Sequence, residues 1–117
     1  MEPQYRYCTS ADGTRISFST LGGGPLPTHV IVDGWGFLQE WAWQLPGFFA
    51  FDSGMAQERC VVRFDRRGVG GSQRAVDDLS LDAHIADVRA IVEHLELTEF
   101  DLQGSSDGTP IDRKSVV

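Results

Sequence analysis

The sequence predicts an α/β fold, in which an N-terminal antiparallel hairpin leads into parallel strands with flanking helices. Three observations predict it: short β-branched apolar runs, one long segment of helical periodicity, and turn-rich loops at the ends of the runs. Strands that alternate with helices and loops form parallel βαβ units, whose ligand sites lie at the carboxyl ends of the strands. The loops that follow the strands are therefore the expected place for a functional site.

The chain begins with the expected hairpin. Residues 5–8 and 16–20 alternate polar and apolar side chains on either side of an Asp-Gly pair at 12–13. An Asp-Gly pair flanked by alternation strongly predicts a hairpin. The glycine-rich stretch 22–25 predicts a loop, and residues 29–32 (His-Val-Ile-Val) then form a β-branched run typical of a strand buried on both faces.

The middle of the chain predicts a second buried strand at residues 60–64 (Cys-Val-Val-Arg-Phe). The segment 37–54 before it is rich in aromatic residues and is interrupted by Pro46 and Gly47. This composition favours one or two short helices rather than a single long one, because proline ends or kinks a helix.

Residues from Ser80 onward predict the longest helix. Serine suits the N-cap, and apolar residues follow it at spacings of three and four. These apolar residues are Leu81, Ile85, Val88, Val92 and Leu95. Four aspartates just before this helix and along it are interpreted as a solvated helix start and outer face, where early acids favour the helix dipole. They are Asp77, Asp78, Asp82 and Asp87.

A last predicted strand, residues 100–103, ends in a loop with the pattern Gly104-x-Ser106-x-Gly108. This is the nucleophile-elbow pattern, in which the serine sits on a strained strand-to-helix turn and small residues two places away avoid backbone clashes. The motif alone is weak, because a Gly/Ser-rich surface loop also matches it. The strand before it and two further loops that fit the same architecture favour Ser106 as a nucleophile.

The loop after residues 60–64 is more specific. Its pattern Asp65-x-Arg67-Gly68-x-Gly70-x-Ser72 resembles the loop after the fourth strand of α/β-hydrolase-fold enzymes. The resemblance covers almost the whole chain. It implies that Asp65, Arg67, Gly68 and Gly70 form a structural loop beneath the active site, with the Asp and the Arg tying the turn together.

The stretch Asp33-Gly34-Trp35-Gly36 falls where such enzymes carry the loop after the third strand, usually written His-Gly or Pro-Gly. The resemblance implies an oxyanion hole formed by the backbone N–H groups of Trp35 and Asp107, since the hole needs backbone donors rather than a particular side chain. Asp33 departs from the pattern, and its carboxylate would oppose an oxyanion if it pointed inward. The alternative is a tight glycine turn with a buried Trp35.

Composition and charge argue against several functional classes. The net charge of −7 disfavours nucleic-acid binding, which needs clustered cations, and the basic cluster at 63–67 belongs to the motif loop. No apolar run reaches the length of a signal peptide or a membrane span. Cys8 and Cys60 form no metal-spaced pair, so we expect reduced thiols in a cytoplasmic protein. No metal or organic cofactor is implied, and the expected partner is a small-molecule substrate.

None of the three histidines is predicted to be the catalytic base. His84 and His94 lie in the predicted helix and His29 begins a strand, whereas the resemblance places the acid and the histidine after the serine. The implied function is hydrolysis of an ester, amide or related acyl bond by a covalent serine mechanism, in a chain that is inactive alone because its acid and histidine are missing. The alternative is a non-catalytic, hydrolase-like ligand-sensing domain of a larger regulatory protein.

Residues 1–111 are interpreted as the N-terminal part of an α/β-hydrolase domain, and residues 112–117 as an artefactual tail. The tail contains the chain's only lysine, does not resemble the helix expected after an elbow, and equals one translation of a common sequencing-adapter DNA. A natural truncated paralogue is the alternative. The resemblance implies an incomplete sheet of order 1-2-4-3-5, whose open edge at residues 100–103 favours aggregation of the isolated chain.

Overall fold

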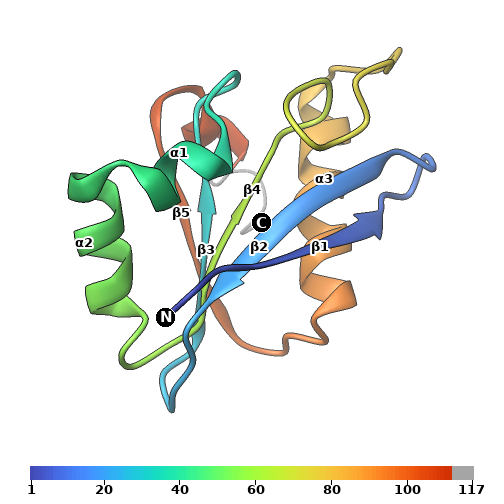
Figure 1. Ribbon diagram of the computed structural model, residues 1–117. Coiled ribbons are helices and arrows are strands. Elements are labelled where there is room, and N and C mark those ends of the chain that lie inside the picture. The colour runs from blue at the N-terminus through green and yellow to red at the C-terminus, as the bar shows by residue number, and fades with distance from the viewer. Residues whose placement is uncertain (112–117) are drawn as a thin grey trace.

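A five-stranded mixed sheet with helices on both faces carries the fold, and it confirms the predicted class (Figure 1). The computed structural model describes residues 1–111, so the tail interpreted as artefactual, 112–117, lies outside the described residues. The strands are β1 (Gln4–Thr9), β2 (Arg15–Leu21), β3 (Thr28–Val32), β4 (Val61–Phe64) and β5 (Phe100–Gly104). The helices are α1 (Gln39–Gln44), α2 (Pro46–Met55) and α3 (Leu81–His94).

The strand order is β1-β2-β4-β3-β5, as the resemblance implies. Strands β1 and β2 form the predicted antiparallel hairpin, and Gly13 in its turn has a φ of 89°, which favours glycine. Strand β2 also pairs antiparallel with β4, whereas β3 pairs parallel with both β4 and β5. The carboxyl ends of β3, β4 and β5 therefore meet at one edge, where the three motif loops begin.

Two apolar clusters fill the two faces of the sheet. Val30 and Val32 of β3 belong to the cluster under α3, whereas Ile31 packs in the other cluster with Trp43 of α1. Successive side chains of a strand point to opposite faces, so a run of β-branched residues is buried on both sides. Strand β3 is therefore the doubly covered strand that its sequence predicts.

The helices confirm the predicted N-cap at Ser80 and the two short helices around Pro46. The Ser80 hydroxyl accepts a hydrogen bond from the Ala83 N–H group at 3.2 Å and caps α3. Pro46 occupies the first position of α2, where a proline needs no N–H partner, so the residue that separates the two short helices also begins the second one.

Candidate active site

Ser106 follows β5 in a tight 3₁₀ turn and has a φ of 55°, in the left-handed region that residues with a side chain rarely adopt. The Ser105 N–H group donates to the Val32 carbonyl at 2.9 Å, and the Gly108 N–H group donates to the Ser105 carbonyl at 2.8 Å. The turn is thus held against the end of β3. Backbone strain of this kind gathers at functional sites, where the surrounding structure maintains it.

Two glycines allow the loops after β3 and β5 to approach each other. A Cβ atom on Gly108 would overlap the Val32 carbonyl oxygen, so no larger residue fits there without a shift of the backbone. A Cβ atom on Gly34 would lie 3.3 Å from the Ser106 Cβ atom and 3.6 Å from its Oγ atom. The loop that carries Trp35 therefore packs directly against the serine.

The Trp35 N–H group, expected to face an oxyanion, donates instead to the Asp107 side chain, at 2.8 Å from Oδ1. The same oxygen accepts a hydrogen bond from Arg66 Nη1, also at 2.8 Å. The Trp35 residue is 52% exposed, so the alternative of a buried Trp35 is wrong. Its indole N–H group donates to the Arg67 carbonyl at 3.3 Å.

Asp33 is held in a buried network of ion pairs. Its carboxylate accepts both hydrogen bonds from Arg63 Nη1, at 2.8 and 2.9 Å, and the same guanidinium binds Asp52 of α2 at 2.6 Å. All three side chains are buried. Burial raises the pKa of Asp33, although the charge of Arg63 acts in the opposite direction. By the sequence alone, an inward-pointing Asp33 carboxylate would oppose an oxyanion. Pairing with Arg63 offsets this negative charge.

A cavity of about 650 Å³ opens beside Ser106. Four aromatic residues line it, Trp35 and Phe37 from the loop after β3 and Phe48 and Phe51 from α2. The paired Asp33 and Arg63 lie in the same lining. The sequence pointed to aromatic residues between 37 and 54, but not to their position around the serine. The space suits a ligand with an apolar part next to the hydroxyl group.

The loop after β4 is closed by hydrogen bonds to Asp65. Its carboxylate accepts from the Gly71 N–H group within the loop and from the Gln39 N–H group at the start of α1, both at 2.9 Å. Gly68 and Gly70 have φ values of 82° and 57°, and a Cβ atom on Gly70 would overlap the Asp65 carboxylate. These contacts close the loop and join it to the start of α1.

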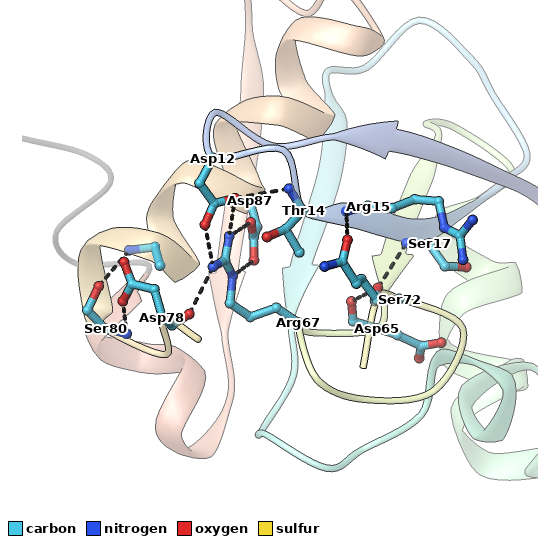
Figure 2. Close-up of polar contacts among 12 residues, drawn as sticks. Asp12, Thr14, Arg15, Ser17, Asp65, Arg67, Ser72, Asp78, Ser80 and Asp87 are labelled. Carbon is cyan, nitrogen blue, oxygen red and sulfur yellow. Dashed lines mark hydrogen bonds and ion pairs between the residues drawn. The ribbon is translucent and has the colours of Figure 1, made fainter. Parts of the chain in front are cut away.

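Arg67 reaches out of the loop and joins three other parts of the chain (Figure 2). Its guanidinium binds Asp87 of α3 at 2.7 and 2.8 Å, Asp12 of the hairpin turn at 2.8 Å, and the Asp78 carbonyl at 2.8 Å. The prediction that Asp87 is solvated is wrong, because its side chain is 1% exposed. A helical carboxylate can be buried when a bidentate arginine compensates its charge.

The contacts of the three histidines are with residues other than Ser106. His29 shares a hydrogen bond with Gln103 at 2.7 Å, and His94 packs edge-on against Phe18. His84 is buried on α3, where burial and then the charge of Arg66 lower its pKa. Within residues 1–111, no hydrogen bond joins a histidine to Ser106.

In the described part of the chain, no group of His, Cys, Asp and Glu is arranged to hold a metal ion. Cys8 and Cys60 are free thiols, and burial raises the pKa of Cys8 to about 11. No helix within residues 1–111 is long and apolar enough to span a membrane.

Arg66 is the residue of this site that the sequence did not single out. The motif-loop interpretation covers it together with Arg63 and Arg67, yet it contacts the residue next to the predicted nucleophile. Its position in the loop after β4, at the same sheet edge as Ser106, was the available indication.

Solved structures similar to this chain include proteins of different activities. The bottromycin epimerase BotH, solved with bottromycin A2, is 26% identical over 96% of the chain, with a TM-score of 0.81. An α/β hydrolase from Sphaerobacter thermophilus is 25% identical over 94% of the chain, with a TM-score of 0.77. An epoxide hydrolase from Vigna radiata is 18% identical over 97%, with a TM-score of 0.79, a likeness in fold alone.

The chain spans 43% of the epimerase, 39% of the Sphaerobacter hydrolase and 34% of the epoxide hydrolase. No curated protein sequence matches it. The model of the alpha/beta hydrolase fold family matches residues 30–111, which include all three motif loops and Ser106. This chain belongs to the α/β-hydrolase fold family.

Proposed function

We propose that this segment belongs to a serine hydrolase that cleaves an ester, amide or related acyl bond through a covalent intermediate on Ser106. The observation that carries the proposal is the left-handed backbone of Ser106 at the end of β5, beside a cavity of about 650 Å³. Membership of the α/β-hydrolase fold family and the likeness to the Sphaerobacter hydrolase support it.

In this mechanism the Ser106 oxygen bonds to the carbonyl carbon while a base accepts the hydroxyl proton. The carbonyl electron pair moves onto its oxygen, which backbone N–H groups of Trp35 and Asp107 would stabilise. The leaving group departs with a proton, and water then releases the acyl group from the serine. The aromatic walls favour a small-molecule substrate with an apolar acyl or alcohol part.

The acid and the histidine of such a mechanism would follow residue 111. We propose that residues 1–111 are the N-terminal part of a longer hydrolase domain and that residues 112–117 do not belong to it. The coverage of 34–43% of the similar structures supports this. Genomic DNA that continues past codon 111 with other codons is the expected finding, and a native stop after Val117 would contradict it. The "complete protein" below is the product of that continued reading frame.

A non-catalytic, ligand-sensing domain of a larger regulatory protein is the second candidate. One observation favours it. The Asp107 carboxylate already accepts the hydrogen bond of the Trp35 N–H group, which acyl transfer needs for the substrate oxygen. The likeness to the bottromycin epimerase is in keeping with a use of this fold other than hydrolysis.

A fluorophosphonate probe separates the two candidates, since it labels only an activated serine. The complete protein should be labelled at Ser106, and Ser106→Ala should lose the label. The isolated 117-residue chain should not react, because loss of the triad partners reduces serine reactivity about a million-fold. A complete protein that carries the acid and the histidine but stays unlabelled would favour the sensor. Labelling of the isolated chain would point to a base within it, with His84 and His94 the first to test.

A further inference from the structure

Two hydrogen-bond donors from different loops converge on one carboxylate oxygen next to Ser106. The Trp35 N–H group follows β3, and Arg66 Nη1 follows β4; each lies 2.8 Å from Asp107 Oδ1. Donors that converge at this distance are the arrangement by which an oxyanion hole binds a negatively charged oxygen. The Asp107 oxygen therefore has the charge and the contacts that an oxyanion would have.

This oxygen also borders the space around the serine hydroxyl. A Cβ atom built on Gly34 would stand 3.5 Å from Asp107 Oδ1 and 3.6 Å from Ser106 Oγ. Both oxygens thus face the same glycine, on which no side chain separates them. An oxygen of a group attached to Ser106 would share this space.

The arginine donor is more firmly held than the carboxylate. The Arg66 side chain is 7% exposed, and its Nη1 atom also donates to the Asp33 carbonyl at 3.3 Å. Its buried Nε atom has no hydrogen-bond partner within the described part of the chain. The Asp107 side chain is 59% exposed. Water can replace the protein donors of an exposed carboxylate at little cost, so Asp107 is the member of this group that can leave.

We propose that the Trp35 N–H group and the Arg66 guanidinium together bind the substrate oxyanion, and that the Asp107 carboxylate occupies their site until substrate displaces it. The inference rests on the proposed function of Ser106. It adds a charged side chain to the backbone donors, so Arg66 is a catalytic residue that neutralises the oxygen onto which the carbonyl electron pair moves. The site takes carboxylates and carboxylate-like oxyanions as a class.

Labelling rates of the complete protein with a fluorophosphonate test this arrangement. Asp107→Ala should react about tenfold faster, because the site is then open in all molecules instead of a fraction of them. Asp107→Asn, which keeps the shape without the charge, should lie between this variant and the wild type. Arg66→Gln added to Asp107→Ala should slow labelling about a hundred-fold, the typical loss for one oxyanion donor. Arg66→Lys in the same background should lose less, and thermal unfolding checks that each variant is folded.

Sodium formate supplies a second readout with a free carboxylate. It should slow the labelling of Asp107→Ala in competition with the probe, while sodium chloride at equal ionic strength should not. The wild type, whose site is already filled, should respond weakly to formate.

The outcomes separate a failure of the roles proposed for Asp107 and Arg66 from a failure of the function proposed for Ser106. If the wild type is labelled at Ser106 but Asp107→Ala reacts no faster, Asp107 is not an internal ligand. If Arg66→Gln leaves the Asp107→Ala rate unchanged in a folded protein, Arg66 only positions Asp107. If neither the wild type nor Asp107→Ala is labelled, the proposed function itself fails and the inference fails with it.

Discussion

The loops after β4 and β5 are both rich in glycine and begin at the same edge of the sheet, yet their polar contacts differ in kind. In the β4 loop, the Arg67 side chain is fully buried and binds acidic residues of the hairpin and α3. In the β5 loop, Ser106 has a strained backbone and Asp107 holds an exposed carboxylate against two donors. Buried, fully paired contacts secure the fold, whereas exposed contacts on a rigid frame can be exchanged for contacts to a ligand.

The largest expected effect comes from the β5 loop and concerns activity alone. Ser106→Ala in the complete protein should reduce ester turnover about a million-fold, because no nucleophile remains. The free energy of unfolding should change by less than about 0.5 kcal/mol, as for other substitutions outside the core. Hydrolysis of a p-nitrophenyl ester and urea unfolding measure the two quantities. Retained turnover would show that the β5 loop does not carry the nucleophile.

The corresponding change in the β4 loop should act on stability. Arg67→Met leaves the Asp87 carboxylate buried without its partner, which costs about 3–5 kcal/mol in unfolding free energy. The double variant Arg67→Met with Asp87→Leu should recover much of this loss, since an apolar pair can replace a buried ion pair. Turnover per folded molecule should match the wild type. A selective loss of turnover in folded Arg67→Met would make the β4 loop functional as well.

A steric change tests whether the β5 loop also depends on close packing. Gly108→Ala would place a Cβ atom against the Val32 carbonyl, and overpacking of this kind costs about 1–3 kcal/mol. Gly54→Ala in α2 is the matched control, because its Cβ atom meets nothing within 4 Å. Thermal unfolding should separate the two variants. Equal stabilities would show that the turn adjusts freely.

The smallest effect is expected at the outer contact of Arg67. The hydrogen bond from Arg67 lowers the pKa of Asp12, so the folded state binds fewer protons than the unfolded state. This contribution is present above the unfolded pKa of about 3.9 and is lost as the pH falls through the lower folded value. Asp12 is 44% exposed, so Asp12→Asn should cost less than about 1 kcal/mol at pH 7 and still less near pH 3. Urea unfolding at both pH values measures the difference, and an equal cost at pH 3 would contradict it.

The sequence predicted what depends on neighbouring residues. The Asp-Gly turn, the Ser80 cap and the β-branched strand at 29–32 each follow from a local pattern, and the structure confirms them. The sheet order came from the resemblance rather than from any local pattern, and it is confirmed as well.

The contacts that the sequence missed join residues far apart in the chain. Asp87 was assigned to solvent because it lies among helical acids, and its burial depends on an arginine that precedes it by 20 positions. The contact between Trp35 and Asp107 spans 72 positions. A local pattern contains no information on such partners, so the candidate site was predicted as a set of loops and not as a set of contacts.

The sheet order also has a consequence for how the chain folds as it leaves the ribosome. Strands β2 and β3 follow each other in the sequence, but β4 lies between them in the sheet. A nascent chain that ends before Val61 therefore contains the β1–β2 hairpin and β3 but lacks the strand that joins them, so β2 and β3 each have an unpaired backbone edge. Pairing between strands that lie far apart in the sequence also forms slowly. We expect the emergence of β4 to be the step that joins the hairpin and β3 into one sheet. A pause in translation before that point would therefore prolong the time in which the unpaired strand edges can misassemble.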